Sequence, residues 1–176
     1  MNVVVVPPNP GWAKAFEGEA QQIMAALGGI VEGIHHIGST AIIGIPAKPV
    51  IDILLVVGDM EALDQRSPEM QYLGYEVMGE FGIPGRRYFR KDGPGGVRSH
   101  QVHAFHSTSD HVVRHLAFRD FMNANPNLAT AYGELKVRLA LEHPHDIQAY
   151  MLGKDAFIKE NERKALRWIE DANRNA

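Results

Sequence analysis

The 176-residue sequence contains no cysteine, which excludes disulfide frameworks and thiolate-rich zinc sites. Its first residues lack the basic segment and the long apolar core of a signal peptide. No apolar run approaches the roughly 20 residues that a membrane-spanning helix needs. We therefore expect a cytoplasmic protein with no membrane partner.

A strong excess of charge is also absent, because the formal net charge is -3. The sequence thus gives no electrostatic signal for binding duplex nucleic acid or an anionic membrane. A hydrophobic share of 45% and a charged share of 22% are ordinary for a globular protein. The length suits one compact domain over residues 1–176, and nothing in the composition indicates an oligomeric state.

The hydrophobic pattern predicts an α+β chain, with a mixed sheet flanked by helices and a predominantly helical part over residues 111–176. Residues 10–27 have helical spacing, and residues 60–73 do as well, with an interruption at Ser67-Pro68. Strands are predicted over residues 3–6, 30–37, 50–57, 75–78, 87–91 and 98–105. Later helices are predicted over residues 111–124, after Asn125-Pro126, and from Asp146 toward Trp168.

One carboxylate, Asp52, lies within an otherwise apolar strand. Burying an unpaired carboxylate is costly, so such a residue usually lies at a strand end, pairs with a cation or binds a metal. Gly38 and Ser39 directly follow another predicted strand, where backbone N–H groups and a hydroxyl can meet phosphate oxygens. Metal-assisted phosphoryl or nucleotidyl transfer requires a phosphate-holding turn near a metal-binding carboxylate.

The segment around this carboxylate also carries a family resemblance. Its blocks are His36-Ile37-Gly38-Ser39-Thr40-Ala41, Pro46-Ala47-Lys48-Pro49 and Ile51-Asp52-Ile53, and further blocks follow around Arg86-Arg87, His103, Arg119, Tyr132 to Lys136 and Tyr150 to Lys154. Together they resemble the GrpB family (UPF0157) of the nucleotidyltransferase-fold superfamily, over nearly the whole chain. The resemblance implies a nucleotidyltransferase-like fold of the polymerase-β type and a divalent metal cofactor, Mg or Mn, with Zn as a further option.

The sequence departs from the superfamily pattern at its metal site. The superfamily has a second acid two residues after the first, and this chain has Leu54 there. Residues 52 and 54 share one face of a strand. The strand expected to supply a third acid offers His100 and His103, which point to opposite faces. Two-metal catalysis needs bridging carboxylates, and Asp52 alone cannot provide them.

Three interpretations of this departure remain open. Asp52 could hold one metal ion with His103 or His36, a ligand set better suited to manganese, zinc or iron than to magnesium. An acid such as Glu32 or Glu80 could instead be supplied by another part of the fold. In the third interpretation the pocket binds a ligand without catalysis.

Several residues near the motif are candidate contacts for the phosphates of a substrate. They offer backbone N–H groups, hydroxyls or cations, and they are Gly38, Ser39, Thr40, Lys48, Arg87, Arg119, Tyr132 and Lys136. Tyr132 and Lys136 are four residues apart and share one helical face. In related transferases a helix lysine and a tyrosine contact the triphosphate. The same spacing recurs at Tyr150 and Lys154.

These observations favour a metal-dependent nucleotidyltransferase-like protein that acts on a nucleotide or small molecule, with Asp52 as the catalytic residue. The alternative is a non-catalytic nucleotide- or metabolite-binding protein on the same fold. A third hypothesis is a metal-dependent phosphohydrolase that uses the histidines. All transferase-like hypotheses require Gly38-Ser39 and Asp52 to lie on adjacent strands and to face one cleft.

Overall fold

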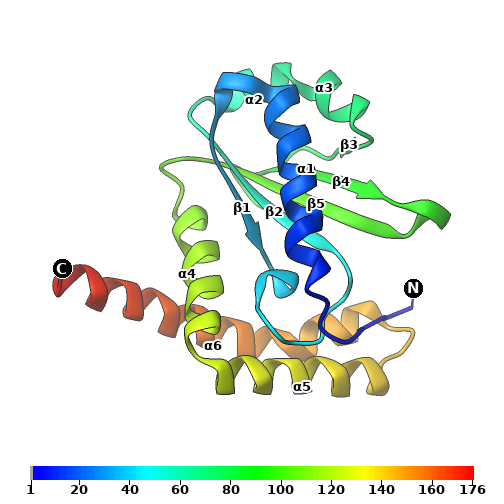
Figure 1. Cartoon of the computed structure of the whole chain (residues 1–176), viewed down its shortest axis with the longest axis vertical. Coiled ribbons are helices and arrows are strands. Elements are labelled where there is room, and N and C mark those ends of the chain that lie inside the picture. The colour runs from blue at the N-terminus through cyan, green and yellow to red at the C-terminus, as the bar shows by residue number, and fades with distance from the viewer. Residues whose placement is uncertain (1) are drawn as a thin grey trace.

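The computed structural model describes residues 2–176 and contains a five-stranded sheet with the order β1-β2-β5-β4-β3 (Figure 1). The strands are β1 (Val31–Ile37), β2 (Ile51–Val57), β3 (Glu76–Val77), β4 (Arg87–Asp92) and β5 (Arg98–His106). β2 and β5 run parallel, and the other neighbouring pairs are antiparallel. The sheet is therefore mixed and the chain is α+β, as the hydrophobic pattern predicted.

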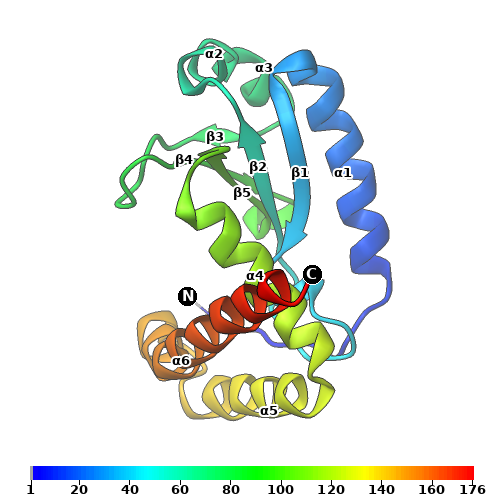
Figure 2. The same ribbon diagram turned by 90° about the vertical axis from the view of Figure 1, so that its left-hand side faces the viewer.

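Helices cover both faces and one end of the sheet. They are α1 (Gly11–Leu27), α2 (Met60–Gln65), α3 (Ser67–Tyr72), α4 (Asp110–Ala124), α5 (Pro126–Glu142) and α6 (Ile147–Arg174). Figure 2 shows α1 and α4 on opposite faces of the sheet, and α5 and α6 at the end where β1 finishes and β2 begins. Within residues 2–176, no helix is both long enough and apolar enough to cross a membrane.

The central strand β2 explains why the sheet buries both faces. Ile53 and Leu55 point into the core cluster that α1, α2 and α3 cover, whereas Leu54 and Val56 pack with Phe105 on the face of α4. Fully burying such a side chain contributes roughly 1.5–3 kcal/mol relative to exposure. Because both faces are covered, the strand is almost continuously apolar, and Asp52 is the exception near its first residue.

The prediction of a strand over residues 3–6 is wrong. Val6 forms only an isolated bridge with Ala47, and Val3 instead donates its backbone N–H to Pro144 and packs against Leu139. The apolar run at the start of the chain is therefore explained by contacts with the C-terminal helices. The last helix also continues past Trp168 to Arg174.

Candidate functional site: a polar pocket at the end of the sheet

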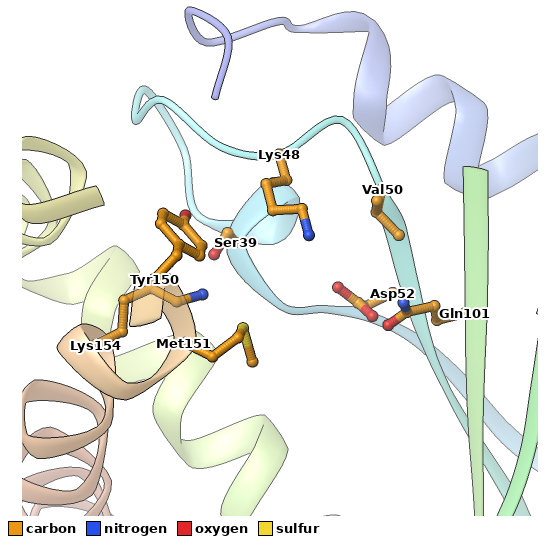
Figure 3. A pocket seen from close by; sticks show the side chains of 8 residues that line it. All are labelled: Ser39, Lys48, Val50, Asp52, Gln101, Tyr150, Met151 and Lys154. Carbon is orange, nitrogen blue, oxygen red and sulfur yellow. The ribbon is translucent and has the colours of Figure 1, made fainter. Parts of the chain in front are cut away.

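A pocket of about 170 Å³ lies where the sheet meets the first turns of α6 (Figure 3). Its lining residues are Ser39, Lys48, Val50, Asp52, Gln101, Tyr150, Met151 and Lys154. Gly38 and Ser39 directly follow β1, and Asp52 on β2 is the register partner of Ile37. The Gly38-Ser39 turn, which was predicted to hold phosphate, and the Asp52 carboxylate thus lie on adjacent strands and face one pocket. A nucleotidyltransferase-like fold requires this arrangement.

Gly38 brings the turn directly against the carboxylate. Its φ is +74°, a conformation that favours glycine, and an added Cβ would lie 2.6 Å from Oδ2 of Asp52. A 3₁₀ turn at Ser39–Ala41 follows, in which Ala41 donates its N–H to the Gly38 carbonyl at 3.1 Å. The glycine is therefore explained by both backbone conformation and close approach.

Asp52 belongs to a chain of side-chain hydrogen bonds. His103 Nε2 lies 3.2 Å from Asp52 Oδ1, and Arg86 Nη1 lies 3.3 Å from His103 Nδ1. Arg86 is buried, and its other nitrogens donate to the carbonyls of Glu80 and Phe81. Because a guanidinium can only donate, Nδ1 of His103 accepts from Arg86, and Nε2 carries the ring proton toward Asp52.

Two lysines line the pocket, and a third, Lys136, is buried near one of them. Figure 3 shows the ammonium groups of Lys48 and Lys154 pointing into the space between Ser39 and Asp52. Lys136 is 1% exposed, and its Nζ has no hydrogen-bond partner within residues 2–176. Burial lowers the pKa of Lys136 to about 7 and that of Lys154 to about 8, and it also lowers the pKa of Lys48.

Aromatic rings support two of these lysines. Lys136 Nζ lies 4.6 Å from the centre of the Tyr132 ring, and Lys154 Nζ lies 4.4 Å from that of Tyr150. A cation over an aromatic face is stabilised by the ring quadrupole. The hydroxyl of Tyr132 also lies 3.5 Å from the Ser39 hydroxyl, which connects α5 to the turn after β1.

Arg87, which was predicted to contact phosphate, lies away from the pocket. It forms a bidentate ion pair with Asp64 of α2, on the face of the sheet opposite the pocket. Tyr88, not Arg87, is the register partner of His103, and side chains alternate between faces along a strand. Arg86, directly before the strand, reaches the pocket side instead.

His36, which was predicted as a metal ligand together with Asp52, lies on the opposite face of the sheet. On β1 it is the register partner of Ile53, so its side chain lies on the α1 face, where it stacks on Phe16 with ring centres 5.0 Å apart. Burial lowers its pKa to about 4. Its Nε2 lies 2.9 Å from the hydroxyl of Thr40, a bond that stabilises the turn rather than the pocket.

Thr40 and Arg119 also lie outside the pocket. The Thr40 hydroxyl donates to the carbonyl of Val50 at 3.2 Å, and its side chain lines a separate, more apolar cavity. Arg119 donates to the backbone carbonyl of His36 and to the carboxylate of Asp120. Both residues connect parts of the scaffold, so the prediction that they contact phosphate is not supported by their positions.

The side chains present do not fit a resident divalent metal. Within residues 2–176, no three histidine or acidic side chains converge on one point. Leu54 has no exposed surface and packs in an apolar cluster. Glu32 lies against Gly58 at the far end of β1, and Glu80 accepts a hydrogen bond from Gly85. Neither acid supplies the missing carboxylate, and His103 bonds to Asp52 directly.

Several residues in or beside the pocket were not predicted from the sequence. Gln101 and Tyr150 line the pocket and Arg86 bonds to His103, but none of the three was a predicted site residue. Lys154 was singled out only for its repeated spacing from a tyrosine. That spacing was a usable signal, because a lysine four residues after an aromatic residue can lie over its ring. No sequence signal distinguished Arg86 from Arg87, because the pattern predicts the start of the strand at residue 87 but not which face of the strand turns toward the pocket.

Comparison with known proteins agrees with this architecture. The family model described as GrpB protein matches residues 2–164. UPF0157 protein YqkA of Bacillus subtilis is 42% identical over 97% of this chain, but the match covers 49% of that relative, so the chain spans about half its length. The crystal structure of the conserved protein GrpB from Enterococcus faecalis is 44% identical, with a TM-score of 0.90 over 94% of this chain and 99% of that one.

A more distant likeness concerns the fold alone. The Cid1 poly(U) polymerase with bound MgGTP has a TM-score of 0.54 and 13% identity, over 79% of this chain and 45% of that chain. By family match and by architecture, this chain belongs to the GrpB family and has a nucleotidyltransferase-like fold.

Proposed function

We propose that this chain binds a nucleotide or another phosphorylated small molecule in the pocket between the turn after β1 and α6. The observation that carries the proposal is that Lys48 and Lys154 line this pocket beside Ser39. Lys136 is buried close enough to Lys154 for the two charges to interact, and its Nζ lacks a hydrogen-bond partner within residues 2–176. Burying an unpaired charge costs several kcal/mol. A bound anion close to Lys136, Lys154 and Lys48 would offset that cost.

The backbone around the pocket supports the same ligand class. The turn after Gly38 presents a 3₁₀ segment and the Ser39 hydroxyl beside the lysines, and such turns suit phosphate oxygens. The distant fold relative Cid1 binds MgGTP. A fold likeness alone does not carry a ligand over, so the lysines and the turn carry the argument.

Ligand binding tests the proposal directly. Nucleoside triphosphates, diphosphates and pyrophosphate are screened by thermal shift, with and without Mg²⁺ or Mn²⁺, and the best ligand is measured by calorimetry. A ligand at 100 times its dissociation constant stabilises the protein by about 2.7 kcal/mol. We expect Lys48→Met to weaken binding, and Lys14→Met to leave it unchanged because Lys14 is exposed on α1. Absence of any shift across the panel would contradict the proposal.

A second candidate function is metal-dependent nucleotidyl transfer, which is favoured by the position of Asp52 on β2 beside Gly38 and Ser39. The residues present do not fit a resident metal, so an ion would have to enter with the nucleotide, whose phosphates supply most of its ligands. Assays for pyrophosphate and phosphate release with Asp52→Asn as control test transfer and phosphohydrolysis together. If nucleotides bind but none is turned over, transfer and hydrolysis are both contradicted and only the binding function remains.

A further inference from the structure

Hydrogen bonds within the protein already occupy both ring nitrogens of His103, which limits the ligands available to a metal ion. His103 accepts from Arg86 at Nδ1 and donates from Nε2 to Asp52. Neither ring nitrogen therefore has a lone pair free for a metal ion, because a ligating imidazole nitrogen must be unprotonated. The carboxylate of Asp52 remains as a single acidic ligand.

The strand geometry closes the position where a second acidic ligand would stand. Leu54 shares the face of Asp52 and is fully buried with Ile37, Val56 and Phe105. A carboxylate there would be surrounded by apolar side chains. A single acid falls short of the carboxylate set that a two-metal site uses to hold its ions.

Positive charge is supplied by the protein instead. Lys48, from the loop before β2, and Lys154, from α6, line the pocket. Lys136, from α5, is buried near Lys154, whose charge acts on it. Their charges act on one another: Lys154 lowers the pKa of Lys136, and Lys48 lowers that of Lys154. The attraction of Asp52 for Lys48 and Lys154 is smaller than the effect of burial.

We propose that the pocket binds the phosphate groups of its ligand free of metal, with Lys48, Lys136 and Lys154 neutralising the charge that divalent cations would otherwise neutralise. The inference rests on the proposed function and specifies its ligand as an uncomplexed di- or triphosphate. In this arrangement Asp52, held by His103, lies beside the ligand as a repulsive charge toward phosphate. A metal-binding Asp52 would have the opposite effect.

The test measures binding of inorganic pyrophosphate and of ATP by calorimetry, in buffer with EDTA and in buffer with excess Mg²⁺. We expect binding in EDTA to be at least as tight as in Mg²⁺. Lys154→Met should weaken binding by about tenfold or more, as expected for the loss of one charge-assisted contact. Lys136→Met should weaken it severalfold without lowering the melting temperature, because it removes a buried amine that has no hydrogen-bond partner within residues 2–176.

Asp52→Asn gives the sharpest distinction, because metal-free binding and metal-dependent binding predict opposite changes in the affinity for phosphate. With lysines as the counter-charge, removing the carboxylate leaves phosphate binding unchanged or tighter. Binding that appears only with Mg²⁺ or Mn²⁺ and is lost in Asp52→Asn would overturn the inference while leaving the proposed function intact. Failure of pyrophosphate, ATP and the other phosphorylated ligands in both buffers would overturn the inference together with the proposed function.

Discussion

Lys136 is a charged side chain that the fold holds at 1% exposure over the ring of Tyr132. In the unfolded chain a lysine has its ordinary pKa near 10.5, whereas burial lowers the pKa of Lys136 to about 7. Between these values the unfolded state binds more protons than the folded state. The free energy of unfolding must therefore rise with pH over this range.

We expect the ligand-free protein to gain stability as the pH increases from about 7 toward 10, while affinity for an anionic ligand falls. Urea denaturation at a series of pH values measures the slope, and Lys136→Met is the matched variant. It should be more stable than the parent at neutral pH and should show a shallower slope. An identical slope in the variant would show that Lys136 keeps its ordinary pKa in the folded state.

At the scale of elements, the close contact of α5 with the loop before β2 positions the pocket. Gly133 on α5 faces this loop, and an added Cβ would lie 2.9 Å from Cδ of Pro46 and 3.3 Å from Cβ of Ile45. Glycine inside a helix is ordinarily about 0.5–1 kcal/mol less stable than alanine. Here the lack of a side chain lets helix and loop approach closely.

We expect Gly133→Ala to destabilise the protein by roughly 1–3 kcal/mol, the cost of overpacking a tight contact. Gly18→Ala on α1 is the control, because no atom lies within 4 Å of its added Cβ, and it should stabilise by up to about 1 kcal/mol. Chemical denaturation measures the change in the free energy of unfolding for both variants, and we expect the two changes to have opposite signs. A stabilising Gly133→Ala would mean that the loop can move away without cost.

The elements themselves were largely predictable from the sequence. The apolar run around Asp52 indicated a strand covered on both faces, and Ser67-Pro68 correctly marked the interruption between α2 and α3. The face of the sheet to which each side chain points was harder to predict. In the antiparallel pairing of β1 with β2, Ile37 rather than His36 is the partner of Asp52. A shift of one residue reverses the face of a side chain, and hydrophobic pattern alone does not fix the register of two strands.

At the scale of the whole molecule, the pocket joins two regions that are distant in sequence. The sheet and its loop contribute Ser39, Lys48 and Asp52, whereas α6 contributes Tyr150 and Lys154. Figure 1 shows α5 and α6 below the sheet, and residues from the sheet side and from α6 line the pocket. A ligand that contacts both sides must therefore stabilise the docking of α6 on the sheet.

We expect a bound phosphorylated ligand to slow amide hydrogen exchange both in residues 38–50 and in residues 147–154. Exchange reports local opening of the folded chain, and both segments border the pocket. Mass spectrometry with and without ligand measures the effect, and residues 11–27 of α1, which do not line the pocket, serve as the internal reference. Protection confined to one of the two segments would contradict a ligand that spans the pocket.

The bridge between Val6 and Ala47 has a practical consequence for handling the protein. The two residues exchange backbone hydrogen bonds of 2.9 and 3.1 Å, directly beside Lys48. A deletion that removes Val6 would break both hydrogen bonds, and a tag joined close to Val6 would lie beside the loop that carries this lysine. Purification handles belong after Arg174 instead, where the last helix extends into solvent.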